Sequence, residues 1–121
     1  MIQQMNFLGL VVKDLETATR FYKETLGLSV NKEQSIPNLY TQLYLEGETI
    51  LGLITGFEQE GIDQAFDAAL RVTDIDTLYA QYQEKGVELL GEPRDMPFGR
   101  TFLFRTPDGH VLRAYTPPSE N

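Results

Sequence analysis

The chain contains no cysteine and a single histidine, His110. Without cysteine it can form no disulfide, no thiolate metal site and no cysteine nucleophile. With one histidine, a metal site would have to consist mainly of carboxylates, which suit Mg²⁺ or Ca²⁺ better than Zn²⁺. The lack of cysteine also fits a cytoplasmic protein, and we expect that location.

Long apolar runs and an excess of positive charge are also missing. No apolar stretch approaches the roughly 20 residues that span a bilayer, and the segment MIQQMNFLGL lacks the basic start and cleavage site of a signal peptide. The net charge of −8 disfavours a nucleic acid partner, which requires clustered lysine and arginine. The 121 residues therefore predict one soluble domain with neither a membrane nor a nucleic acid partner.

An internal repeat is present. VVKDLETATRFYKE (11–24) aligns with RVTDIDTLYAQYQE (71–84), and TILGLIT (49–55) aligns with HVLRAYT (110–116) after a shift of one further residue. Such self-similarity indicates two related structural units. We expect a single domain over 1–121, made of two modules at about 1–55 and 65–116 and joined by the polar linker 56–63.

Each module is predicted to contain one strand, one helix and three further strands. Asp14 and Asp74 are natural N-caps of the two helices, and Gly27 and Gly86 end them. The strands are expected at 5–12, 28–35, 39–46 and 49–55, and again at 65–72, 87–91, 99–106 and 110–116. The fold class is therefore α+β, with two βαβββ repeats forming a curved mixed sheet around a cleft, where a small ligand would bind.

Two motifs carry a family resemblance. DLETATRFYKETLGL and GEPRDMPFGRTFLFRTPDGHVL resemble the helix motif and the second-half signature of the vicinal-oxygen-chelate superfamily, which has the glyoxalase/bleomycin resistance/dihydroxybiphenyl dioxygenase fold. Phe98 and Thr106 depart from that signature, which usually has Trp and Asp there. The resemblance implies a curved sheet around a cleft and a homodimer.

The resemblance also implies four positions for metal ligands, which here are Phe7, Gly52, Asp67 and Arg113. Phenylalanine and glycine have no ligand atom in their side chains, and arginine is a permanent cation. We therefore expect no metal and no other cofactor. A metal site outside these positions would need Asp67 with Glu46 or Glu48.

Strand alternation gives each module two kinds of face. One face carries Phe7, Gly9, Ile50, Gly52, Asp67, Ala69, Arg71, Arg113 and Tyr115, and the other is uniformly apolar and belongs under the helices. Asp67 and Arg113 are predicted either to form an ion pair or to be solvated separately. Alternatively, Arg71 and Arg113 receive a carboxylate or phosphate of a ligand.

Aromatic residues complete the predicted site. Tyr40, Tyr44, Phe98 and Tyr115 are candidates to line the cleft, because aromatic faces hold flat or cationic ligands, and each could instead pack in the core. The segment 92–100 is expected to be a loop that brings Phe98 and Arg100 to the ligand. The candidate ligand-binding residues are Phe7, Tyr40, Tyr44, Gly52, Asp67, Arg71, Phe98, Arg100, Arg113 and Tyr115.

The leading functional hypothesis is a metal-free binding protein, similar to glyoxalase/bleomycin-resistance proteins, that holds a small organic molecule such as an antibiotic or metabolite. The alternative is an enzyme resembling a lactoylglutathione lyase, isomerase or dioxygenase, with Asp67 as candidate acid or base. The third is an interaction module whose cleft is closed by side chains. His110 follows the PDG turn with the opposite parity to Arg113, which favours a place near the sheet edge.

Overall fold

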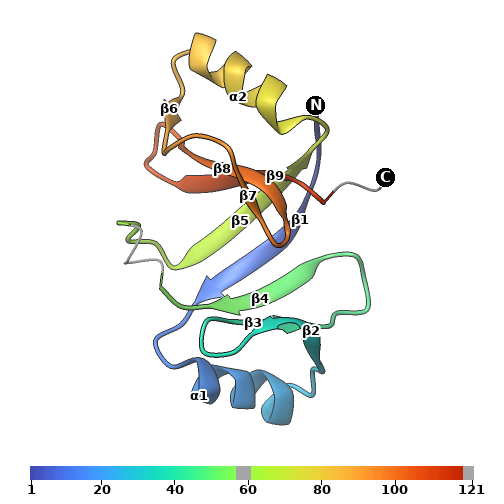
Figure 1. Ribbon diagram of the computed structural model, residues 1–121. Coiled ribbons are helices and arrows are strands. Elements are labelled where there is room, and N and C mark those ends of the chain that lie inside the picture. Colours follow the sequence, from blue (N-terminus) through green and yellow to red (C-terminus); the bar gives the residue numbers. More distant parts are fainter. Residues whose placement is uncertain (57–60, 119–121) are drawn as a thin grey trace. The chain divides into compact units, whose positions relative to one another are not determined.

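The structure is a computed structural model that describes residues 1–56 and 61–118. Residues 57–60 of the predicted linker 56–63 therefore lie outside the described residues. The elements in chain order are β1 (Ile2–Val11), α1 (Leu15–Arg20), η1 (Phe21–Thr25), β2 (Val30–Ile36), β3 (Tyr40–Leu43), β4 (Ile50–Ile54), β5 (Phe66–Val72), α2 (Ile75–Glu84), β6 (Glu88–Leu89), β7 (Arg94–Met96), β8 (Gly99–Arg105) and β9 (Val111–Thr116) (Figure 1).

The chain forms two compact units whose boundary lies inside β1. The first unit is Phe7–Asp67, and the second unit is Met1–Asn6 together with Ala68–Asn121. Hydrogen bonds hold the start of the chain in the second unit. The Thr73 amide donates to the Met1 carbonyl at 3.0 Å, and the Tyr115 hydroxyl donates to Asn6 Oδ1 at 2.6 Å.

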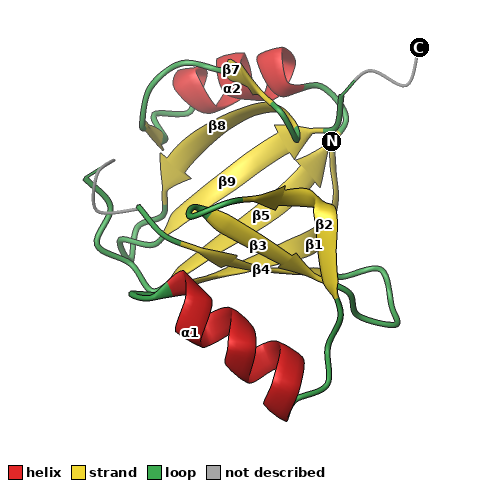
Figure 2. Cartoon of the chain, turned by 60° about the horizontal axis from the view of Figure 1, so that its bottom comes forward, coloured by secondary structure: helices red, strands yellow, loops and turns green. Residues whose placement is uncertain are grey.

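Both units pair their strands by the same plan. In the first unit β1 runs parallel to β4, β3 is antiparallel to β4, and β2 is antiparallel to β3. In the second unit β5 runs parallel to β9, β8 is antiparallel to β9, and β6 is antiparallel to β8. The sheets are mixed, as predicted (Figure 2). The first unit has the predicted order βαβββ, whereas the second unit inserts the short strand β7 between β6 and β8.

The predicted helix starts and stops are confirmed. Asp14 Oδ1 accepts from the Thr17 amide and Asp74 Oδ1 accepts from the Thr77 amide, each at 3.2 Å. These bonds to the amide of the third residue stabilise the charged carboxylates and hold the pKa of both aspartates below its usual value. Beyond the helices, Gly27 and Gly86 take φ of 75° and 78°, a left-handed conformation that glycine adopts at little cost.

The two helices differ in a way that the repeat did not predict. The first is α-helical only over Leu15–Arg20 and continues as η1, a π-helical turn, whereas α2 is regular throughout. None of the residues of α1 or η1 is buried, whereas Ile75 and Leu78 of α2 are 2% and 3% exposed. The second helix is thus packed tightly onto its sheet and the first is not.

The prediction of a loop at 92–100 is wrong in part, because this segment contains the short strand β7. β7 pairs antiparallel with β8, with Met96 opposite Gly99. Gly99 has φ of 135°, and a Cβ at this position would collide with the Thr116 carbonyl oxygen, so only glycine fits. The many turn-forming residues hide this strand in the sequence.

The core of the second unit lies between α2 and one face of its strands. Phe102 is 2% exposed and meets Tyr79 and Tyr82 edge to face at centroid distances of 5.3 and 6.0 Å. Val72 and Ala114, both on the face predicted to lie under the helix, are in the same cluster. The alternation deduced from sequence is therefore correct in this unit.

We predict that Phe102→Ala lowers the free energy of unfolding by about 3–5 kcal/mol, because it removes a buried ring and leaves a cavity beneath α2. Urea denaturation measures this change. The control is Leu39→Ala, because Leu39 is 54% exposed and should change stability little. Equal effects of the two substitutions would contradict the placement of the core.

Candidate functional site

In the first unit, four of the predicted site residues lie in one group, the Phe7–Tyr40 group, which we define as Phe7, Tyr40, Gly52 and Asp67 with Gly9 between them. The ladder of β1 and β4 places Gly9 directly opposite Gly52. The rings of Phe7 and Tyr40 lie 6.3 Å apart at an angle of 39°. A Cβ at position 9 would lie 3.0 Å from the Phe7 ring and 3.3 Å from Asp67 Cβ. The group thus brings two aromatic rings and a carboxylate together.

The two glycines are required by this packing. A Cβ at position 52 would lie 2.5 Å from Tyr40 Cε1 and 3.1 Å from Phe7 Cζ. The Tyr40 ring therefore occupies the space into which a side chain at position 52 would project. Gly9 was not among the predicted site residues, although it shares the face and register of Gly52, which is the signal that could have found it.

Tyr40 is held in a polar and partly buried environment. Its hydroxyl donates to Gln42 Oε1 at 2.8 Å. Burial raises the pKa of the Tyr40 phenol well above its usual value, and the negative charge of Asp67 raises it further. Asp67 itself is 7% exposed. The phenol therefore remains protonated and keeps donating to Gln42 throughout the physiological pH range.

In the second unit, three predicted site residues form another group, the Phe98–Arg113 group, which consists of Phe98, Arg113 and Tyr115. The Cζ atom of Arg113 lies 5.3 Å from the centre of the Phe98 ring, within range of a cation–π contact. Phe98 also meets Tyr115 edge to face at 6.3 Å. Arg113 and Tyr115 are each 8% exposed, whereas Phe98 is 41% exposed. An aromatic side chain at the tip of the β7–β8 hairpin thus covers a buried guanidinium group.

The strand registers support the predicted faces. Ala69 pairs with Arg113 and Arg71 pairs with Tyr115 on β5 and β9, as the alternation predicted. Asn6, which accepts the hydrogen bond of the Tyr115 hydroxyl, was not predicted. No local pattern connects two residues that are separated by 109 positions. The ion pair between Asp67 and Arg113 stays a prediction.

Three other candidates lie apart from these contacts. Arg100 donates to Asp76 through Nη2 at 3.0 Å and to Asp95 through Nη1 at 3.1 Å, and the hydrogen bonds to Asp76 and then Asp95 raise the pKa of its guanidinium group. Arg100 therefore joins β7 and β8 to the start of α2. Tyr44 follows β3 and is 55% exposed, and His110 is exposed in the turn before β9.

The metal site that the resemblance implies does not fit these residues. Phe7 and Gly52 offer no ligand atom, and the ring of Tyr40 occupies the space beside Gly52. Among residues 1–56 and 61–118, no three His, Asp or Glu side chains lie close enough together to hold a metal ion. We therefore derive no chemistry from a metal at these positions.

In the same described segments, no helix is long and apolar enough to cross a membrane.

Comparison with known proteins connects this geometry to a family. The model of the Glyoxalase/Bleomycin resistance protein/Dioxygenase superfamily matches residues 4–113. The chain belongs to this superfamily. The chain is also similar to the Uncharacterized protein YraH of Bacillus subtilis (strain 168), with 27% identity over 118 residues, 88% of this chain and 92% of that protein.

Solved structures agree with the superfamily fold. Methylmalonyl-CoA epimerase from Mycobacterium tuberculosis superposes with a TM-score of 0.76 at 20% identity, covering 98% of this chain and 91% of that one. An extradiol ring-cleaving dioxygenase from B. fuscum superposes with a TM-score of 0.72 at 25% identity, covering 98% of this chain and 33% of that one. The family model thus confirms the predicted superfamily, and these structures confirm its fold.

We predict that Gly52→Ala destabilises the protein by about 1–3 kcal/mol, because the added methyl group collides with the Tyr40 ring. In the Tyr40→Ala background the same substitution should cost much less. A double-mutant cycle of urea denaturation measures this coupling. Gly47→Ala is the control, because a Cβ there meets nothing within 4 Å. Additive effects of the two substitutions would exclude the contact.

We also predict that stability falls as the pH rises above about 10, where tyrosines of the unfolded chain ionise. The pKa of Tyr40 is raised in the folded protein, so above about pH 10 the unfolded chain loses this proton before the folded protein does. The contribution of Tyr40 to the free energy of unfolding is therefore complete below that pH and is lost above it. Tyr40→Phe should weaken this alkaline loss, and Tyr44→Phe should not. Denaturation at about pH 8, 10 and 11, which spans the phenol pKa of the unfolded chain, measures the difference.

Proposed function

We propose that this protein binds a small organic molecule, and that the Phe7–Tyr40 group of the first unit supplies part of the binding surface. The observation that carries the proposal is the packing of the Tyr40 ring over Gly52. The rings of Phe7 and Tyr40 thereby lie where the superfamily resemblance implies metal ligands. Aromatic faces of this kind bind flat or cationic groups by stacking.

The Phe98–Arg113 group of the second unit is a second candidate surface for an organic molecule, proposed by itself. The partly exposed Phe98 ring offers an apolar face for stacking, and the guanidinium group of Arg113 lies against that ring. The proposed ligand is therefore an organic molecule with a flat apolar portion. An antibiotic or a metabolite would meet this description. The homodimer and the cytoplasmic location expected from the sequence stay predictions.

A second candidate function is catalysis by Asp67. Asp67 is 7% exposed as a residue, and its charge lies close enough to Tyr40 to raise the pKa of that phenol. A buried carboxylate can act as general acid or base when its pKa lies near the working pH. Asp67→Asn would then abolish conversion of a bound compound and leave its binding in place. Unchanged conversion would exclude this role.

The binding proposal is tested by thermal shift with a panel of neutral, cationic and anionic aromatic compounds. A compound that binds the folded protein raises the melting temperature, and at about 100 times its dissociation constant it adds about 2.7 kcal/mol to stability. We expect such a compound to lose most of its effect in Phe7→Leu. The matched control is Phe21→Leu, which changes a ring that is 49% exposed on η1. A panel without any stabilising compound, or equal responses of the two variants, would contradict the proposal.

A further inference from the structure

The two repeats allow the strands beneath α1 and α2 to be compared residue by residue. Leu53 of β4 and Ala114 of β9 are equivalent positions of the repeat. Across the ladder, Leu53 pairs with Thr41, and Ala114 pairs with Phe102. Thr41 in the first unit therefore takes the position that Phe102 has in the second.

The helices show a matching difference. Thr19 and Tyr79 each lie five positions after the capping aspartate of their helix. In the second unit the rings of Tyr79 and Phe102 pack edge to face at 5.3 Å. In the first unit the hydroxyl groups of Thr19 and Thr41 form a hydrogen bond of 2.9 Å instead. Two aromatic rings that fill the second unit are thus replaced by two small polar residues.

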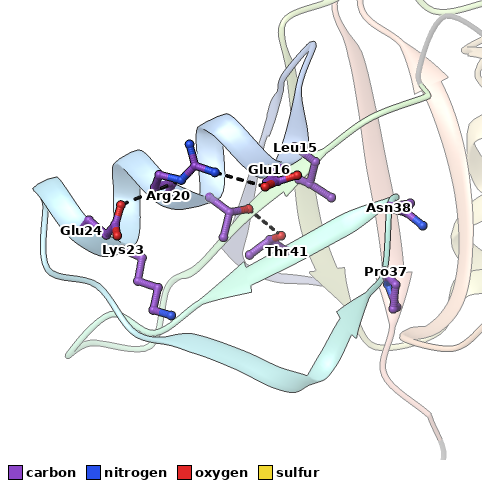
Figure 3. Close-up of a pocket in the computed structure, with 9 residues that line it drawn as sticks. Leu15, Glu16, Arg20, Lys23, Glu24, Pro37, Asn38 and Thr41 are labelled. Atoms are coloured by element: carbon purple, nitrogen blue, oxygen red, sulfur yellow. Dashed lines mark hydrogen bonds and ion pairs between the residues drawn. The ribbon is translucent and has the colours of Figure 1, made fainter.

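A pocket lies at this place in the first unit (Figure 3). Its volume is about 480 Å³, within the roughly 300–1,000 Å³ range of small-molecule sites. The lining combines apolar, hydroxyl and charged side chains of α1, η1 and the β2–β3 hairpin, namely Leu15, Glu16, Thr19, Arg20, Lys23, Glu24, Pro37, Asn38 and Thr41.

The charged side chains of this pocket are not equivalent. Arg20 is held by Glu16 at 3.1 Å and faces Glu24 at 4.0 Å, so these three charges largely satisfy one another. Lys23 forms no ion pair within the part of the chain that the structure describes. In Figure 3 its side chain leaves the helix toward the strands. Lys23 is therefore the cation that the pocket offers to a ligand.

The hydroxyl pair offers a further donor. The hydrogen bond between Thr19 and Thr41 uses one hydroxyl proton, so the accepting hydroxyl group still has a proton to donate. Lys23 belongs to η1, where the chain leaves the α-helix for a π-helical turn. Such turns are rare and occur frequently at functional sites. The pocket thus combines ring-sized space with one cation and one hydroxyl donor.

We propose that this pocket binds a small aromatic carboxylate, with the ring beside Leu15 and Pro37 and the carboxylate at Lys23 and the threonine pair. The site is separate from the Phe7–Tyr40 group, because Tyr40 and Thr41 point to opposite faces of β3. It does not depend on the proposed function.

The proposal is tested by NMR titration of the ¹⁵N-labelled full chain with phenylacetate, benzyl alcohol and benzylamine, which share a ring and differ in charge. We expect phenylacetate to bind best and to shift the amide signals of Thr19, Lys23 and Thr41. Benzylamine binding more tightly, no binding of phenylacetate, or shifts confined to other residues would overturn the proposal.

Two sets of variants locate the binding. Lys23→Gln should weaken phenylacetate binding about tenfold, because a charge-assisted hydrogen bond is lost, and Lys32→Gln on β2 is the matched control. Thr19→Tyr with Thr41→Phe, which copies the second unit, should fill the pocket and abolish binding. Lys23→Gln alters an exposed side chain, so the test holds even where the filled variant does not fold. Unchanged affinity in Lys23→Gln would overturn the proposal.

Phe7→Leu separates this site from the proposed function. It should bind phenylacetate with the affinity of the unsubstituted protein, because Phe7 does not line the pocket. Loss of phenylacetate binding in Phe7→Leu would assign the compound to the Phe7–Tyr40 group and overturn the pocket proposal. Loss of binding in Lys23→Gln alone would support the pocket whatever the outcome for the Phe7–Tyr40 group.

Discussion

The contact between the Tyr40 ring and Gly52 determines what the first unit can hold. A Cβ at position 52 would lie 2.5 Å from the ring, so the residue there must be glycine. The glycine in turn leaves the space that the Tyr40 ring fills, and in that position the Tyr40 hydroxyl group donates to Gln42. Burial and the charge of Asp67 keep the phenol protonated. One steric condition thus sets the shape, the hydrogen bonding and the ionisation of the group.

The two units use one pairing plan but fill it differently. In the first unit a fully buried Leu53 lies opposite a threonine, whereas in the second a fully buried Ala114 lies opposite a phenylalanine. A large residue on one strand is balanced by a small one on the next, which keeps each core packed. On the helix side no such compensation exists, because Thr19 of α1 is much smaller than Tyr79, the equivalent residue of α2. The space beneath α1 follows from that difference.

Much of the fold could be predicted because its determinants are local or periodic. The N-caps Asp14 and Asp74 and the alternation of Leu53 with Gly52 depend only on near neighbours in the sequence. The strand β7 was missed because three residues between turn formers carry no periodic signal, and the π-helical turn because it does not alter the apolar spacing. The bond from Arg100 to Asp76 and the bond from Tyr115 to Asn6 connect residues that are 24 and 109 positions apart, and no single-sequence pattern encodes such pairs.

A superfamily fold constrains the chemistry of its members less than the residues at a few positions do. In this chain the absence of a ligand at position 52 is coupled to Tyr40, so a glutamate there would require that ring to move or be lost. A second substitution would be needed at Phe7, whose ring also lies within 3.1 Å of the position-52 Cβ. Because the three residues pack against one another, they must change together. The packing of Phe7 and Tyr40 over Gly52 is therefore a different set of side chains on the same fold. Single substitutions would not convert it into a metal site.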